Sequence, residues 1–219
     1  YARRQHAPQF VVATSALLRP EEKPMNKPRD YADLARVDRT HVSLYTASDV
    51  FEDELERIFY RSWVYVAHES ELPNPGDYKT TFIGLVPVIV SRDLAGEIHV
   101  LVNRCMHRGA TVCATEKGHA QSFTCPYHGW EFALDGSLKA IAMPRGYNAG
   151  ELDKDKLNLV SAVRVGTYRG IIFASLLAEP DISLDQKLGG VKEYIDLYMD
   201  FSPVGEILVG RSGVNKHLY

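Results

Sequence analysis

The first clear pattern of hydrophobic and polar positions lies between Thr46 and Arg61. Thr46 and Asp49 have the spacing of a capping box at a helix N-terminus. The apolar positions that follow recur at helical spacing, opposite charged ones; they are Phe51, Leu55, Ile58 and Phe59. We therefore predict one amphipathic helix that ends near Arg61.

From Trp63 the pattern changes to short runs rich in Val, Ile, Thr and aromatic residues, separated by turn signals. Strands are predicted at 63–67, 79–83, 86–91, 97–103, 122–124 and 131–134. Turn residues fill 73–76 and 93–96, and the dipeptide at 135–136, Asp-Gly, predicts a tight hairpin. The pattern predicts a small antiparallel β domain from about Trp63 to about Ile141.

Fewer elements are predicted beyond this domain. A loop over 143–150 leads to strands at 159–165 and 170–175, joined by a turn at Tyr168 and Arg169, and Asp181 and Ser183 precede a helix over 184–199. These elements are too few to enclose a core of their own, so we expect them to begin a second domain that the chain does not finish.

The predicted fold class is mainly β, with small antiparallel sheets preceded by a helix and followed by the start of an α+β domain. Three domains are predicted: an extended arm over 1–45, the helix and β domain over 46–150, and a truncated domain over 151–219.

Composition and charge exclude two classes of function. The 219 residues, 45% hydrophobic and 24% charged, are typical of a globular protein, and a net charge of -3 provides no basic face for nucleic acid or an anionic membrane. The apolar stretch 82–90 is interrupted by Gly84 and Pro87 and is shorter than the ~20 residues of a membrane span. Three cysteines, an odd number, fit a reducing compartment, so we expect a cytoplasmic protein.

Two short segments carry the chemistry. Cys105-Met106-His107-Arg108-Gly109 and Cys125-Pro126-Tyr127-His128-Gly129-Trp130 each supply one thiolate and one imidazole from a turn with a glycine just behind the histidine. Two such loops can clamp a metal centre from opposite sides. The donor set suits a two-iron cluster in which two cysteines ligate one iron and two histidines ligate the other. Neutral imidazoles would raise its reduction potential to roughly -150 to +300 mV.

Two other interpretations of these four residues are open. Their grouping could be a coincidence, or they could hold zinc, because two cysteines and two histidines are also a tetrahedral zinc set. Zinc fingers usually pair cysteine with cysteine on one turn and histidine with histidine on a helix, whereas each loop here mixes them. The mixed arrangement favours the cluster.

The paired motifs resemble the ligand pattern of the Rieske oxygenases, the large (alpha) subunits of bacterial aromatic-ring-hydroxylating dioxygenases. The likeness extends to 63–70, 73–78 and 168–170, covers roughly 46–210, and is nearest to the benzoate, anthranilate and salicylate type. It implies a [2Fe-2S] cluster on Cys105, His107, Cys125 and His128, with 151–219 as the beginning of the catalytic domain. Respiratory Rieske proteins fit less well because each of their ligand loops has an extra cysteine, and small Rieske ferredoxins lack the preceding helix.

The resemblance also implies partners. Electrons would come from NADH through a flavin-containing reductase, directly or by way of a ferredoxin, and the cluster would pass them to a mononuclear Fe(II) beside a small aromatic substrate, for which we expect an aromatic carboxylate. The implied assembly is a homotrimer or a trimer of alpha-beta pairs. In the family one cluster histidine faces a carboxylate of the neighbouring subunit; His128 is our first candidate and His107 the second.

The mononuclear iron site is not expected within this sequence. It needs two histidines and one carboxylate, yet the only histidine after His128 is His217. We therefore expect a truncated subunit with no catalytic residues of its own and no activity alone. We predict an oxidoreductase component, the Rieske portion of a dioxygenase large subunit; the alternative is a stand-alone Rieske-type electron carrier or a zinc-binding module.

Among the remaining residues, Cys113 is expected to be a buried free thiol. We expect Tyr127 and Trp130 to pack against the ligand loops, and His68, His99 and His119 to be surface or packing histidines.

Overall fold

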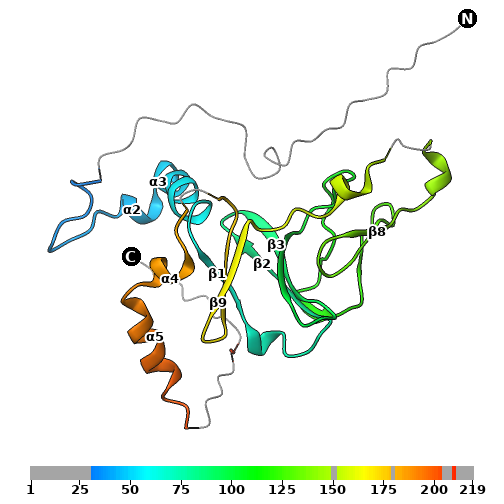
Figure 1. Ribbon diagram of the computed structural model, residues 1–219. Helices are drawn as coiled ribbons and strands as arrows, with labels where there is room; N and C mark the ends of the chain where they lie inside the picture. The colour runs from blue at the N-terminus through cyan, green and yellow to red at the C-terminus, as the bar shows by residue number, and fades with distance from the viewer. Residues whose placement is uncertain (1–30, 149–151, 179–180, 204–208, 211–219) are drawn as a thin grey trace, which may run out of the picture. The chain divides into compact units, whose positions relative to one another are not determined.

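In sequence order, short helices precede the first strand and follow the last one in the computed structural model (Figure 1). The structure describes residues 31–148, 152–178, 181–203 and 209–210. The chain divides into two compact units, Tyr1–Val50 and Phe51–Tyr219. In the described part of the first unit, an isolated bridge between Ala35 and Thr40 precedes the one-turn helix α2 (Ser43–Thr46).

The predicted helix exists, but it starts later than the capping box suggested. Thr46 is the last residue of α2, where its Oγ1 donates to the Val42 carbonyl at 3.3 Å. Ala47 is extended, and α3 (Ser48–Glu54) begins after it. The prediction that Thr46 caps the helix is therefore wrong, because its hydroxyl bonds backward to the preceding turn.

The helix ends in a π-helical segment, Leu55–Phe59, where the Tyr60 N–H donates to the Leu55 carbonyl at 2.9 Å. Such a turn carries one extra residue and shifts the register of the side chains. Leu55 is buried, but Phe51, which precedes this turn, and Ile58, which lies within it, are exposed, so the predicted apolar face is only partly correct. The predicted end near Arg61 is confirmed within two residues.

In the described part of the chain, three antiparallel sheets make the fold mostly β, as predicted. The first has the strand order β4-β3-β2-β5, the second β6-β7-β8 and the third β1-β10-β9. The strands are β1 (Val64–His68), β2 (Asp77–Ile83), β3 (Val86–Arg92), β4 (Ile98–Val102), β5 (Lys117–His119), β6 (Phe123–Thr124), β7 (Glu131–Phe132), β8 (Leu138–Ala140), β9 (Arg164–Tyr168) and β10 (Ile171–Ser175). Short 3-10 helices cover Glu69–Glu71, Pro144–Gly146 and Lys154–Leu157.

Two strands were not among the predicted ranges: β5, which has no hydrophobic pattern, and β8, which was only implied by the predicted hairpin. β5 is exposed throughout and pairs with the first residues of β2. At its centre a Cβ on Gly118 would lie 2.6 Å from the Tyr78 hydroxyl, so the close approach needs glycine. β8 pairs with β7 across the predicted Asp135-Gly136 hairpin.

The third sheet joins distant parts of the chain. Val64 of β1 pairs with Ala174 of β10, so strands that we assign to the beginning of a second domain share a sheet with the first strand. The predicted strand 159–165 begins only at Arg164, because Val160 and Ala162 instead form backbone hydrogen bonds with β4. The predicted domain boundaries stay a prediction.

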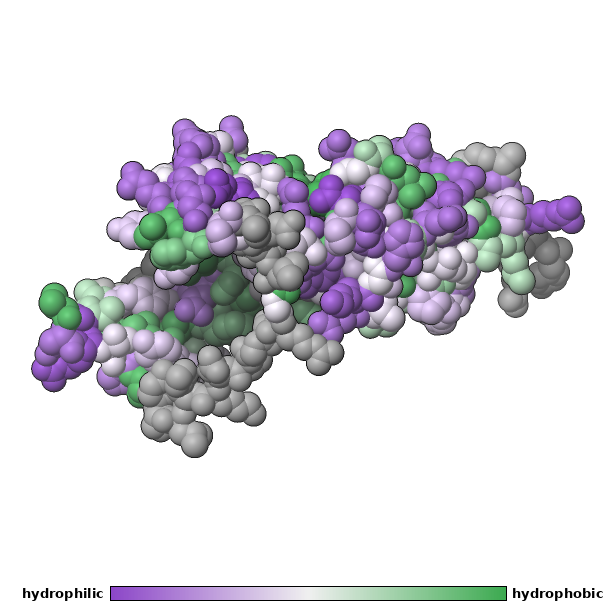
Figure 2. Space-filling view, turned by 90° about the horizontal axis from the view of Figure 1, so that it is seen from below, coloured by the Kyte–Doolittle hydropathy of each residue, from purple (hydrophilic) through white to green (hydrophobic). Residues whose placement is uncertain are grey.

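The predicted helix over 184–199 is two helices, α4 (Leu184–Leu188) and α5 (Val191–Met199). Gly189, with φ 46° and ψ -129°, breaks it, a conformation that glycine adopts readily. Ser183 is the N-cap of α4, as expected. No helix among the described residues is long and apolar enough to cross a membrane. On the face shown in Figure 2, hydrophobic residues lie among hydrophilic ones.

Candidate metal centre

The two predicted motifs fold into loops with the same backbone closure. In the first ligand loop, 103–113, the Cys105 N–H donates to the Ala110 carbonyl (2.8 Å) and the Gly109 N–H donates to the Cys105 carbonyl (2.8 Å). In the second ligand loop, 124–131, the Cys125 N–H donates to the Trp130 carbonyl (2.8 Å) and the Gly129 N–H donates to the Cys125 carbonyl (2.9 Å).

Each loop turns at its glycine, with φ of 71° at Gly109 and 67° at Gly129, where other residues would be strained. The glycine behind each histidine is therefore a requirement of the loop geometry.

The structure brings the four predicted ligands together as a pair of thiols and a pair of imidazoles. The ring centroids of His107 and His128 are 4.6 Å apart at an interplanar angle of 68°. Cys105 and Cys125 are both buried, and the Cys125 thiol lies close enough to act on the pKa of Cys105. Burial and the Cys125 thiol raise the pKa of the Cys105 thiol to about 11. Burial, with His128 and Arg108 nearby, lowers the pKa of His107, so its imidazole is kept neutral.

One atom of this group lacks the partner that buried polar atoms normally have. Nδ1 of His107 is buried and has no hydrogen-bond partner in the described structure. A buried nitrogen without a partner is costly unless something binds it, and a neutral imidazole nitrogen is a good metal ligand. The residues present thus fit an iron centre that this nitrogen would ligate.

The chemistry of the donor set bears on which metal the site would hold. A structural zinc ion needs four donors around one point. Two thiols beside one another and two imidazoles beside one another suit a cluster with two irons better.

Aromatic side chains pack against both histidines, as predicted. The buried Trp130 ring stacks on His107 with centroids 4.8 Å apart and an interplanar angle of 4°. The ring centroids of Tyr127 and His128 are 3.8 Å apart, and Tyr127 is 60% exposed. One face of the His107 ring is therefore covered by the protein core, while His128 lies beside an exposed side chain.

A core of buried residues supports both loops from below. It includes Cys105 and Cys125 themselves together with Ile89, Leu101 and Phe132, so it joins the four-stranded sheet to the sheet that carries the second ligand loop. Cys113 belongs to the same core and is a free thiol, as expected.

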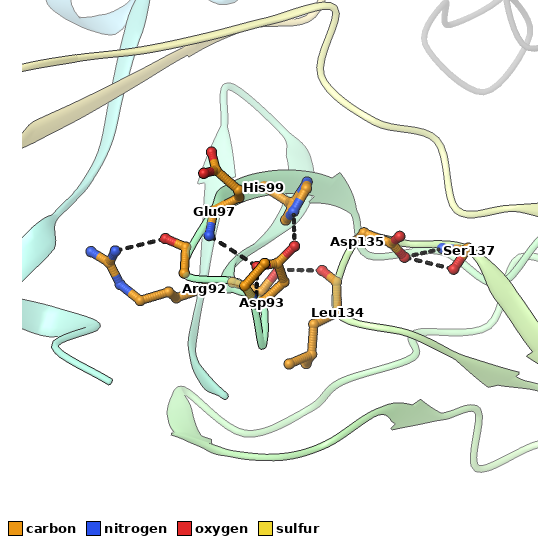
Figure 3. A network of polar contacts seen from close by, with 10 residues as sticks. Arg92, Asp93, Glu97, His99, Leu134, Asp135 and Ser137 are labelled. Atoms are coloured by element: carbon orange, nitrogen blue, oxygen red, sulfur yellow. Dashed lines mark hydrogen bonds and ion pairs between the residues drawn. The ribbon is translucent and has the colours of Figure 1, made fainter. Parts of the chain in front are cut away.

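A polar network links the same two sheets (Figure 3). Ser91 of β3, fully buried, donates through Oγ to the Leu134 carbonyl at 2.6 Å. Nearby, Asp93 accepts from His99 Nε2 and from the Glu97 N–H, both at 2.9 Å. Although burial opposes it, these hydrogen bonds hold the pKa of the Asp93 carboxyl below its usual value. His99 is thus a packing histidine, as expected.

Sequence reasoning missed Asn103, which is buried at the base of the first ligand loop. Its side-chain amide bonds to the backbone of Val112 and Cys113. The residue precedes the Cys-x-His motif by two positions, but a single asparagine carries no periodic signal that would have identified it.

Comparisons with known proteins agree with this geometry. A family model described as Rieske [2Fe-2S] domain matches residues 62–156. The anthranilate 1,2-dioxygenase large subunit of Acinetobacter baylyi is 43% identical over 171 residues, which are 77% of this chain and 36% of that protein. The biphenyl 2,3-dioxygenase subunit alpha of Rhodococcus jostii is 41% identical over 186 residues, 84% of this chain and 40% of that protein.

A solved structure is similar as well. Naphthalene 1,2-dioxygenase from Rhodococcus sp. bound to indole has a TM-score of 0.70 and 38% sequence identity, over 75% of this chain and 37% of that one. The chain thus spans well under half the length of the relatives that it matches.

The match over residues 62–156 indicates that the chain carries a Rieske [2Fe-2S] domain. The relatives then narrow the likeness: over well under half of their length, the chain is similar to large (alpha) subunits of aromatic-ring-hydroxylating dioxygenases. The resemblance predicted from the ligand motifs is confirmed.

Proposed function

We propose that Cys105 and Cys125 ligate one iron of a Rieske [2Fe-2S] cluster and that His107 and His128 ligate the other. The buried, unpartnered Nδ1 of His107 is the observation that carries this proposal. When bound, such a cluster accepts and donates one electron at a time. The chain would then be the electron-delivery part of a ring-hydroxylating dioxygenase.

The protein's own contribution is to hold the donors and to shield them. Because the Cys105 thiol has a pKa of about 11, its proton must leave when iron binds. Trp130 fixes the plane of the His107 ring and excludes water from that face. His128, beside the exposed Tyr127, is the better placed of the two histidines to meet a carboxylate of a neighbouring subunit.

The proposed substrate class and partners follow from the relatives. Anthranilate 1,2-dioxygenase and toluate 1,2-dioxygenase, which is 38% identical over 174 residues, bear the names of aromatic acids, and they support an aromatic carboxylate as substrate. Benzene 1,2-dioxygenase, 42% identical over 171 residues, is about as similar, so sequence identity alone does not distinguish an aromatic acid from an aromatic hydrocarbon as the substrate.

We further propose NADH-derived electrons, supplied by a flavin-containing reductase directly or through a ferredoxin, and a mononuclear Fe(II) in the C-terminal part of the whole subunit. The assembly would be a homotrimer or a trimer of alpha-beta pairs. The three free cysteines support a cytoplasmic location.

The test is to measure iron and acid-labile sulfide in the purified chain and to record the EPR spectrum of the reduced protein. We expect two irons and two sulfides per chain. The average g value should lie below that of plant-type ferredoxins. Cys105→Ala should lose the cluster, whereas the control Cys113→Ala, which changes a buried cysteine outside the ligand set, should keep it. Zinc without sulfide, or cluster loss in both variants, would contradict the proposal.

A second substitution tests the histidine assignment. His107→Cys replaces a neutral ligand by a thiolate, so the potential should fall from the Rieske range towards the roughly -400 mV of all-cysteine plant ferredoxins. An unchanged potential in a variant that still binds iron and sulfide would show that His107 is not a ligand.

A further inference from the structure

The two ligand loops are closed at their bases in different ways. The second loop connects two paired strands, and the ladder between β6 and β7 matches Phe123 with Phe132 and Thr124 with Glu131. The first loop leaves β4 after Val102, and the next strand, β5, pairs with β2 instead of returning to β4. Among the described strands, none therefore closes the base of the first ligand loop.

The Asn103 side chain takes the place of that ladder. Nδ2 donates to the Cys113 carbonyl at 2.6 Å, while Oδ1 accepts from the Val112 N–H at 3.0 Å and from the Cys113 N–H at 2.9 Å. The residue is only 3% exposed, and its own N–H donates to the Pro87 carbonyl of β3 at 2.8 Å. One side chain thus ties the two ends of the loop to each other and to the four-stranded sheet.

We propose that Asn103 is a positioning residue for the cluster, because it holds Cys105 and His107 where they can meet the second loop. This inference rests on the proposed function. The site needs a donor and an acceptor on one short planar group, which only asparagine supplies at this length. Aspartate has no donor for the Cys113 carbonyl, and alanine leaves three buried backbone groups without a partner.

The experiment compares Asn103→Ala and Asn103→Asp with a matched control. Asn158→Ala removes another asparagine-to-backbone bond, from the Leu138 N–H to Asn158 Oδ1 at 2.8 Å, outside both ligand loops. For each protein the melting temperature, the iron and sulfide content, the EPR line shape, the potential and the rate of cluster loss are measured.

We expect the rate of cluster loss to rise by about 10- to 100-fold in Asn103→Ala, in line with the loss of metal affinity when other groups that orient metal ligands are removed. Its EPR line shape and potential should change as well. Asn103→Asp should show changes of the same kind, because it keeps two bonds but places a carboxylate oxygen against the Cys113 carbonyl. Asn158→Ala should lower the melting temperature with a wild-type spectrum and potential.

Two results would overturn the inference, and they are distinguishable. If the wild-type chain binds no iron with sulfide, the proposed function fails and the inference fails with it. If the wild type binds the cluster but the Asn103 variants keep its line shape and potential, and lose it only in proportion to their melting temperatures, Asn103 is structural alone. Should Asn103→Ala not fold, Asn103→Asp decides by the same criteria.

Discussion

Replacing Gly136 by alanine tests how tightly the core beneath the second ligand loop is packed. Gly136, at the β7–β8 hairpin, has φ 90°, and a Cβ there would lie 2.8 Å from Cδ2 of Leu101 and 3.4 Å from Cβ of Leu159. Gly96, at the β3–β4 turn, has nearly the same φ of 93°, but a Cβ there would meet nothing within 4 Å. The two glycines therefore share the backbone strain and differ in the steric contact.

The expected magnitudes follow from this comparison. A left-handed conformation costs a residue with a Cβ about 1–2 kcal/mol, which is the whole effect expected for Gly96→Ala. Gly136→Ala should cost about 1–3 kcal/mol more, because Leu101 is fully buried and cannot swing aside in a close-packed core. A side chain at the surface would have yielded at little cost.

The assay is urea unfolding followed by circular dichroism, with iron content matched among the variants. Leu101→Val should destabilise the wild type but recover part of the loss in the Gly136→Ala background, with a coupling free energy of at least about 0.5 kcal/mol. If Gly136→Ala costs no more than Gly96→Ala, or if the double variant is additive, the packing argument is refuted.

Three further predictions concern the surroundings of the site. Asp93→Asn should lower the free energy of unfolding at neutral pH by at least about 1.5 kcal/mol. Because the pKa of Asp93 is lowered in the folded protein, the difference in unfolding free energy between wild type and variant should shrink as the pH falls below about 4. A difference that stays constant with pH would contradict this prediction. Trp130→Ala should cost about 3–5 kcal/mol in unfolding experiments and speed cluster loss, whereas equal retention would argue against the stack on His107. Ser91→Ala should cost about 1–3 kcal/mol because it strands a buried carbonyl, measured by the same urea titration.

The ligand loops were predictable because their information is local. Cysteine, histidine and glycine follow one another within a few residues, and the glycine at the positive φ is itself part of the motif. Strands with β-branched residues were also found, since their apolar runs become the buried part of β3 and β4.

The features that escaped prediction depend on contacts distant in the chain or on a single residue. β5 is polar and exposed, and it is a strand only because β2 lies beside it. The helix over 184–199 breaks at Gly189, where the Gly189-Gly190 pair is a local turn signal that the helical pattern on both sides of it outweighed in the prediction. Asn103 acts through three hydrogen bonds to backbone groups of residues that themselves show no pattern.

The pairing of β1 with β10 fixes the order in which the chain can complete its fold. Val64 is synthesised long before Ala174, its partner in the ladder, and both ligand loops lie between them. The ligand loops can fold before β10 is synthesised. Until then β1 has an unpaired edge that can associate with other chains. A chain cut at residue 156, where the match to the domain model stops, would keep all four proposed ligands but would lack β10, which is the ladder partner of β1 among the described strands. A fragment that contains all three strands of the third sheet therefore has to extend to Ser175.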